Sequence, residues 1–153
     1  MQPSFVGSNV LSPSHHHTRK PDIIVSDRDH SILAGLLDGF RRGQRPLAAR
    51  FLQSELERAQ VLPLTAMPAN VVTLGAHVLF RDHGTQRARD IKLLSPSESQ
   101  YDDDGISVLT FLGGALLGLS EGQTLSYRAP GGRIRTISVQ QVLLQPRPYK
   151  TLI

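Results

Sequence analysis

Hydrophobic positions between residues 22 and 62 recur with the period of an α-helix in two successive stretches. Ser26 and Asp27 offer side-chain oxygens that can begin a helix, and Pro46 suits the first turn of another. Gly39 marks the connection between the two, and Pro63 ends the second. The pattern predicts a short antiparallel helical hairpin with arms of about 20 Å. Its stripes are Ile32, Leu33, Leu36, Leu37 and Phe40, then Leu47, Phe51, Leu52, Leu56 and Ala59.

From residue 71 onwards the hydrophobic period changes to two, which is typical of strands with one buried face. A glycine-rich run at residues 113–118 predicts one short helical turn. We expect a bulge or kink at Gly75, a turn at residues 130–132, and a phase slip between Ile134 and Ile137. The predicted strands contain Val72, Leu74, Ala76, Val78 and Phe80; Ile91, Leu93 and Leu94; Ile106, Val108 and Leu109; Leu125, Tyr127 and Ala129; and Ile134, Ile137, Val139, Val142 and Leu144.

These elements predict an α+β fold, in which a helical hairpin precedes a small antiparallel β domain that carries a short helix. A short extended run, Ile23 to Val25, comes directly before the hairpin. Polar, proline-containing and histidine-containing sequence at the N-terminus is typical of a disordered tail. The predicted organisation is a tail at 1–21, the hairpin at 22–62, a linker at 63–70, the β domain at 71–147 and a C-terminal tail at 148–153.

Composition narrows the class of protein. The chain of 153 residues contains no cysteine, which excludes disulfides, thiolate metal sites and a cysteine nucleophile. Its apolar runs fall far short of the ~20 residues that span a bilayer. Residues 1–21 also lack the apolar segment of a secretory signal. We therefore expect a soluble cytoplasmic protein without a membrane contact.

No group of residues matches a catalytic or metal-binding pattern. The histidines follow no zinc-ligand spacing, and His15–His17 indicate a polar tract that at most binds a metal loosely. Asp102–Asp104 could chelate Mg²⁺, but successive residues of a turn point in different directions, so a solvated loop is the preferred interpretation. Gly131 and Gly132 lack the context of a phosphate-binding loop. We predict a protein that is not an enzyme and uses no metal or cofactor.

The formal net charge of +4 is concentrated in patches. Arg41, Arg42 and Arg45 lie at the predicted hairpin tip, where Asp38 is the nearest acid, and a second acid-free stretch follows Glu121. Arginine presents a planar fork to carboxylates and phosphates. Two interpretations of the tip stay open: a solvated face, or a contact with an acidic or phosphate-bearing partner. Aromatic residues interleaved for base stacking are missing, so stacking on single strands is not expected.

Residues 106–122 carry a resemblance to a known family. They read Ile-Ser-x-x-Thr-Phe-Leu-Gly-x-Ala-Leu-Leu-Gly-x-x-x-Gly, which resembles the C-terminal signature of the Gre transcription-cleavage factors. Motifs in four other places are similar to the short-hairpin branch of that family, the regulators of nucleoside diphosphate kinase. The resemblance implies that the β domain is FKBP-like. It covers the chain from about residue 22 to residue 147, and the additional motifs lie at residues 55–60, 67–73, 78–81 and 130–132.

The resemblance implies that the globular domain binds bacterial RNA polymerase near its secondary channel. The corresponding loop is formed by Leu109, Thr110, Phe111, Leu112 and Gly113. Gre proteins often carry Asp and then Ser-Pro where this chain has Leu109, Thr110 and Phe111. Phe111 either anchors that contact or belongs to the core. Peptidyl-prolyl isomerase activity is not implied, because a shared fold does not carry function with it.

The hairpin tip departs from the Gre pattern. Gre factors use acidic residues at the tip of a long hairpin to hold a catalytic Mg²⁺ of the polymerase, whereas this hairpin is short and carries arginines. We therefore expect no stimulated transcript cleavage, but modulation of elongation or competition with Gre-type factors, with a family link to nucleoside diphosphate kinase. The alternative is weak, non-specific binding of DNA or RNA through the tip arginines and the basic C-terminal segment.

Overall fold

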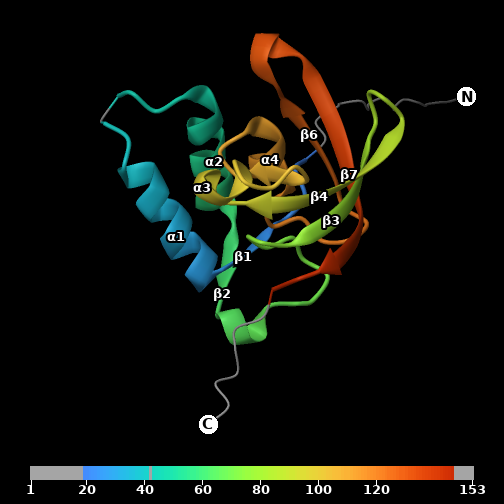
Figure 1. Ribbon diagram of the computed structural model, residues 1–153, viewed down its shortest axis with the longest axis horizontal. Coiled ribbons are helices and arrows are strands. Elements are labelled where there is room, and N and C mark those ends of the chain that lie inside the picture. Colours follow the sequence, from blue (N-terminus) through green and yellow to red (C-terminus); the bar gives the residue numbers. More distant parts are fainter. Residues whose placement is uncertain (1–18, 42, 147–153) are drawn as a thin grey trace, which may run out of the picture.

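The structure is a computed structural model that describes residues 19–41 and 43–146. Two helices lie on one side of the molecule and a curled sheet on the other, with a short helix, α4 (Phe111–Leu116), between them (Figure 1). The predicted α+β fold is therefore confirmed. Outside the described residues lie Arg42 of the predicted tip, most of the predicted N-terminal tail with His15–His17, and the predicted C-terminal tail at 148–153.

The predicted helical hairpin is formed by α1 (Asp27–Asp38) and α2 (Leu47–Arg58). The Ser26 hydroxyl accepts a hydrogen bond from the backbone N–H of Asp29 at 3.0 Å and so caps α1. Pro46 precedes α2 as its N-cap residue rather than lying in the first turn. Two members of the predicted stripes are exposed instead of buried, Ile32 at 40% and Leu47 at 65%. The buried stripe is Leu33 and Leu37 on α1 and Ala49, Leu52 and Leu56 on α2.

Two short parallel strands close the base of the hairpin, and the hydrophobic periods did not predict them as a pair. β1 (Ile24–Ser26) pairs with β2 (Gln60–Leu62), so α2 ends at Arg58 and the chain becomes extended before Pro63. Parallel strands need a crossover between them, and here the two helices supply it. The base is also joined to the rest of the molecule, because the N–H of Ile24 donates to the carbonyl of Gly118 at 3.1 Å.

The β domain is a five-stranded sheet with the order β5-β4-β3-β7-β6. Three strand pairs are antiparallel as expected, but β4 and β5 are parallel, so the sheet is mixed. The helix α3 (Pro96–Ser99) lies in the connection that brings the chain back for this parallel pairing. The strands are β3 (His77–Asp82), β4 (Arg87–Leu94), β5 (Gly105–Ser107), β6 (Thr124–Arg128) and β7 (Ile134–Leu144).

Strand boundaries differ from the predicted ones where backbone geometry interrupts the ladder. The strand expected from Val72 to Phe80 begins only at His77, because the chain turns at Gly75, whose φ of +87° favours glycine. Ile134 is paired without a break with Arg128, so no slip occurs there. The register shifts instead farther along β7, opposite the start and the middle of β3. Short 3-10 turns occupy Leu64–Ala66 and Pro130–Gly132.

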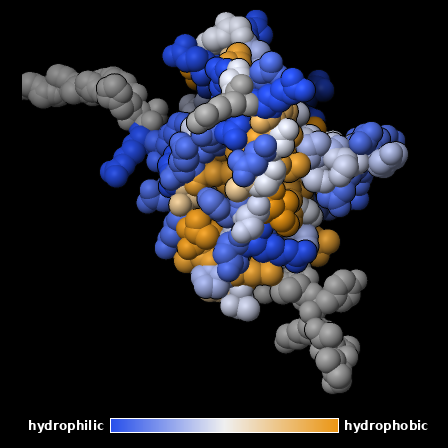
Figure 2. All heavy atoms as spheres, turned by 90° about the vertical axis from the view of Figure 1, so that its left-hand side faces the viewer, coloured by the Kyte–Doolittle hydropathy of each residue, from blue (hydrophilic) through white to orange (hydrophobic). Residues whose placement is uncertain are grey.

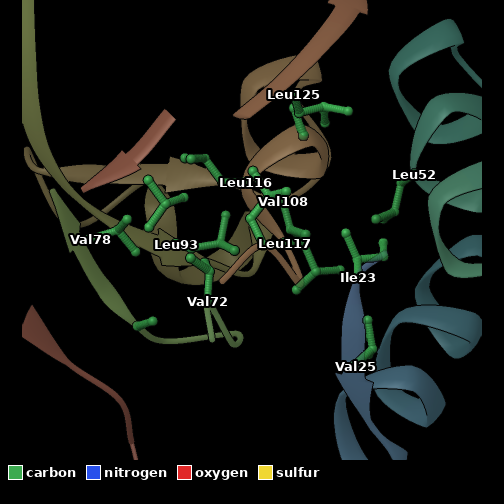
Figure 3. Packing of buried hydrophobic residues seen from close by; sticks show 14 of the residues in the cluster. Ile23, Val25, Leu52, Val72, Val78, Leu93, Val108, Leu116, Leu117 and Leu125 are labelled. Atoms are coloured by element: carbon green, nitrogen blue, oxygen red, sulfur yellow. The ribbon is translucent and has the colours of Figure 1, made fainter. Parts of the chain in front are cut away.

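One hydrophobic core joins the hairpin to the sheet. Side chains from β1 and α2 meet side chains from α4 and the sheet in a single cluster (Figure 3). The predicted hairpin and β domain therefore pack on one shared core rather than on two. Buried members that Figure 3 labels are Ile23, Val25, Leu52, Val72, Val78, Leu93, Val108, Leu116, Leu117 and Leu125.

Candidate functional site

The predicted contact segment, Leu109–Gly113, begins after β5 and runs into the first turn of α4 (Phe111–Leu116), and the hydroxyls of Ser107 and Thr110 order it. Thr110 is the N-cap of α4: its Oγ1 accepts from the N–H of Gly113 at 3.0 Å and donates to the carbonyl of Ser107 at 2.6 Å. The N–H of Leu109 donates to Oγ of Ser107 at 3.1 Å. These bonds hold Thr110 exposed at the surface, with half-buried Leu109 and Leu112 beside it.

Phe111 points toward the hairpin. Its ring stacks on Phe51 of α2 with ring centroids 5.6 Å apart, and Phe51 in turn lies 5.7 Å from Tyr127 of β6. Phe111 is half-buried and packs against the hydrophobic core. Its contacts are therefore those of a packing residue between α2 and α4. Leu109 and Leu112 are also half-buried against the core, which leaves Thr110 as the exposed residue of the segment.

Glycines allow α4 to approach its neighbours closely. A Cβ atom on Gly113 would lie 2.1 Å from the carbonyl oxygen of Ser107, so only hydrogen fits there. The next residue, Gly114, faces the ring of Phe51. Gly113 thus belongs to the buried support of the loop, although the sequence pattern groups it with Leu109–Leu112.

The predicted arginine tip is not a single exposed cluster. Arg45 folds back onto the hairpin, where it donates to the carbonyl of Leu37 at 3.0 Å and to Oε1 of Gln53 at 2.7 Å. Its remaining contact is a 3.5 Å ion pair with Asp38, whose side chain is 82% exposed. Arg41 is exposed. Arg45 therefore caps the C-terminal end of α1, a role that a charge pattern along the chain does not reveal.

Sequence reasoning missed a buried ion cluster at Glu55, whose side chain is 1% exposed. Arg58 binds both of its oxygens, through Nε to Oε2 at 3.0 Å and through Nη2 to Oε1 at 2.9 Å. Lys20 adds a contact of 3.1 Å, and Arg58 also donates to the carbonyl of Pro21 at 2.6 Å. The cluster fixes the segment before β1 onto α2. Its signal in the sequence is the position of Glu55 between Leu52 and Leu56, on the buried stripe.

Asp29 is a second buried carboxyl that the pattern did not single out, although it stands four residues before buried Leu33. Its Oδ2 accepts from the N–H of Leu74 at 2.9 Å, which ties α1 to the segment before β3. It lines a groove of about 380 Å³ together with Thr73 and Ile32. Burial raises the pKa of Asp29 above its ordinary value of 3.8, against the opposing effects of the Leu74 N–H and Arg28.

The raised pKa of Asp29 predicts a pH-dependent cost in stability. Between the ordinary pKa of 3.8 and the raised value, the folded chain holds a proton that the unfolded chain has lost. The free energy of unfolding contributed by this group therefore falls as pH rises through that window and stays low above it. Asp29→Asn keeps an oxygen for Leu74 but does not ionise. Urea denaturation across the window should show the variant gaining stability relative to wild type; a constant difference at all pH values would contradict this.

Other polar side chains are engaged in local contacts. His77 bonds Asp90 across β3 and β4, and Nε2 of His83 lies 2.7 Å from Oγ of Ser138. The pKa of Asp102 is lowered first by a hydrogen bond from the N–H of Asp104 and then by Lys92. Within the described ranges 19–41 and 43–146, no three histidine, aspartate or glutamate side chains gather as a metal site.

Figure 2, which faces the hairpin side, shows hydrophobic surface in the middle and lower part of the molecule, bordered by hydrophilic side chains. Of the helices in the described part of the chain, none is both long and apolar enough to cross a bilayer.

Comparison with known proteins matches both halves of this arrangement. The family described as "Rnk N-terminus" matches residues 21–62, and the family described as "Transcription elongation factor, GreA/GreB, C-term" matches residues 67–143. The Escherichia coli (strain K12) protein named regulator of nucleoside diphosphate kinase is 32% identical over 127 residues, which cover 83% of this chain and 93% of that protein.

Two further relatives carry the Gre name. Transcription elongation factor GreA of Nitratidesulfovibrio vulgaris (strain DSM 19637 / Miyazaki F) is 35% identical over 99 residues, or 63% of this chain and 62% of that protein. The solved structure of a prokaryotic transcription elongation factor GreA/GreB from Nitrosomonas europaea has a TM-score of 0.62 at 30% identity, covering 80% of this chain and 98% of its own. The resemblance found in residues 106–122 is thereby confirmed, and the chain belongs to the GreA/GreB family of transcription elongation factors, in the branch defined by the Rnk N-terminus.

Proposed function

We propose that this chain is a non-enzymatic transcription regulator that binds bacterial RNA polymerase near the secondary channel. The observation that carries the proposal is the match of residues 67–143 to the GreA/GreB C-terminal domain, within a chain that spans 93% of the E. coli regulator. In this role it modulates elongation or competes with Gre-type factors. The name of the E. coli relative supports a link to nucleoside diphosphate kinase.

We assign the polymerase contact to the surface around Thr110, where the chain enters α4. Thr110 is exposed there, and the apolar side chains of Leu109 and Leu112 are half-buried beside it. The bonds of Thr110 to Ser107 and Gly113 order the loop in advance, which lowers the entropy lost on binding. Phe111 and Gly113 support this surface from behind.

Stimulated transcript cleavage is not part of the proposed function. The helices α1 and α2 have 12 residues each, so each arm is about 18 Å long. Near the tip the described residues offer one exposed carboxylate, Asp38, beside the bases Arg41 and Arg45. An acidic pair that could hold a catalytic Mg²⁺ is therefore missing from the described part of the tip. A backtracked elongation complex should cleave its RNA no faster when the protein is added.

Binding to core RNA polymerase tests the proposal. We expect saturable binding that tolerates moderate salt and is displaced by a Gre factor. Leu109→Arg should weaken it about tenfold or more, because it places a bulky cation in the contact loop. Gln140→Arg adds the same charge at an exposed position of β7 and should bind like wild type. Thermal melting establishes that both variants are folded. Equal binding by Leu109→Arg would remove the loop from the interface, and no binding by wild type would refute the function.

A further inference from the structure

The positive charge of this protein gathers at the ends of two β-hairpins. Residues 81–89, around the turn from β3 to β4, and residues 128–136, around the turn from β6 to β7, together contain six arginines and one acid, Asp82. Their formal charge of +5 exceeds the +4 of the whole chain, so all other residues together carry a slight negative charge. When the neighbouring Asp90, which bonds His77, is counted as well, the formal charge of the two ends is +4 and equals that of the whole chain.

The two hairpin ends lie side by side. β3 and β7 are neighbours in the sheet, and the N–H of His83 donates to the carbonyl of Thr136 at 3.0 Å. A groove of about 480 Å³ between them is lined by Gly84 and Thr85 on one side and by residues 133–135 on the other. Figure 1 shows both ribbons extending beyond α4. Segments about 50 residues apart in the chain thus form one surface.

Strand alternation places four of these arginines on one face. Arg89 pairs with buried Phe80, and its guanidinium lies 5.6 Å from that ring. Side chains two residues apart on a strand share a face, so Arg87 lies on the face of Arg89. In β7 the same face buries Ile137 and Val139, and continues through Arg135 to Arg133. We call Arg87, Arg89, Arg133 and Arg135 the arginine face.

The charges of the arginine face are only partly neutralised within the described chain. Among residues 19–41 and 43–146, neither Arg87 nor Arg133 donates a side-chain hydrogen bond, and Arg135 reaches Asp82 only at 3.9 Å. The Asp82 carboxylate already accepts the N–H of Gly84 at 2.8 Å. By contrast, Arg45 and Arg58 are held by several bonds each. Asp82 pairs with Arg87 and with Ile137 and so lies on the same face, where it offsets one of the four positive charges. The remaining excess of three positive charges indicates a surface that attracts an anion.

From this geometry we propose that the arginine face binds the phosphate backbone of nucleic acid without sequence preference. Residues two positions apart on a strand have Cα atoms about 6.6 Å apart, so two arginines on one face can reach successive phosphates of one nucleic-acid strand. The groove is lined by small residues and arginines, and Ile134 is its one large apolar residue. The buried core of a protein–protein interface is typically more apolar than this face, so the lining favours nucleic acid over a protein partner. The contact is separate from the loop before α4 and independent of the function proposed above.

Fluorescence anisotropy tests the inference with a labelled single strand of about 20 nucleotides and a duplex of equal length, over a range of salt concentrations. The triple variant Arg87→Gln, Arg133→Gln, Arg135→Gln should bind at least about tenfold more weakly, with a salt slope reduced by about 2–3. The control, Arg19→Gln, Arg41→Gln, Arg50→Gln, loses the same charge at exposed positions elsewhere and should bind nearly as wild type.

Three results would overturn the inference. They are absence of binding by wild type, equal weakening by both triple variants, and stronger weakening by the control, which would favour the helical hairpin instead. Binding of the first variant to core polymerase free of nucleic acid should match wild type. Loss of that binding with nucleic-acid affinity intact would show that the arginine face contacts protein. The nucleic-acid assay and the polymerase assay use different ligands. A negative result in one therefore does not affect the interpretation of the other.

Discussion

Gly113→Ala is expected to lower the free energy of unfolding by about 3–5 kcal/mol, a large part of the roughly 5–15 kcal/mol that is typical of a folded domain. The added Cβ would lie 2.1 Å from the carbonyl oxygen of Ser107 and 2.9 Å from Cα of Val108. Both are backbone atoms, which cannot rotate away as a side chain would. Nor can α4 shift freely, because the N–H of Gly113 is held by Thr110 at 3.0 Å and the helix is buried against α2.

Gly35→Ala is the matched control. It makes the same chemical change inside α1, where no atom lies within 4 Å of the new Cβ. Alanine is the better helix former, so this variant should gain up to about 1 kcal/mol. Urea denaturation followed by circular dichroism gives both values. A Gly113→Ala protein as stable as wild type would mean that β5 and α4 are not as closely packed as described.

Arg58→Ala should cost about 3 kcal/mol, since it removes the bidentate partner of the buried Glu55 carboxylate. The value lies at the low end of the range for breaking a buried pair because Lys20 remains 3.1 Å from Glu55. The variant also loses the bond from Arg58 to the carbonyl of Pro21, which holds the chain at the entrance to β1. Chemical denaturation measures the loss.

The position of the arginine on α2 decides the size of this effect. Arg50→Ala removes the same side chain from an exposed position of the same helix and should change stability by less than about 0.5 kcal/mol. The double variant Glu55→Leu, Arg58→Leu removes both charges together and should recover most of the loss, since apolar residues often replace a buried ion pair without cost. Equal losses for Arg58→Ala and Arg50→Ala would show that the Glu55 cluster is not buried in solution.

Regular periods made most of the fold predictable. The stripes around Leu33 and Leu52 gave both helices, and alternation around Ile91 and Ile137 gave the long strands. Strands of three residues are too short to show a hydrophobic period, so the pairing of Ile24–Ser26 with Gln60–Leu62 was not predicted. The parallel direction of β5 relative to β4 was also not predicted, because side chains alternate between the two faces in the same way in parallel and antiparallel strands.

The candidate site was predictable only where a motif marked it. The motif located Leu109–Gly113, but the direction of Phe111 depends on Phe51, which lies 60 residues earlier. Charge counted along the chain pointed to the helical tip, where Arg45 is in fact held by Leu37 and Gln53. The arginine face could not be read in this way, since its two halves become neighbours only through the pairing of β3 with β7.

The closure of the hairpin base has a mechanical consequence. Gln60 bonds Ile23 within the hairpin base, whereas Ile24 bonds Gly118 and Asp29 bonds the Leu74 N–H, so the hairpin is joined to the β domain at two separate points. A hinge needs a segment that can rotate without breaking such bonds, and none is left between β1 and α1 or between α2 and β2. We therefore expect the helical hairpin and the sheet to move together as one rigid body. A partner that binds the surface around Thr110 therefore also fixes the orientation of the tip of the helical hairpin.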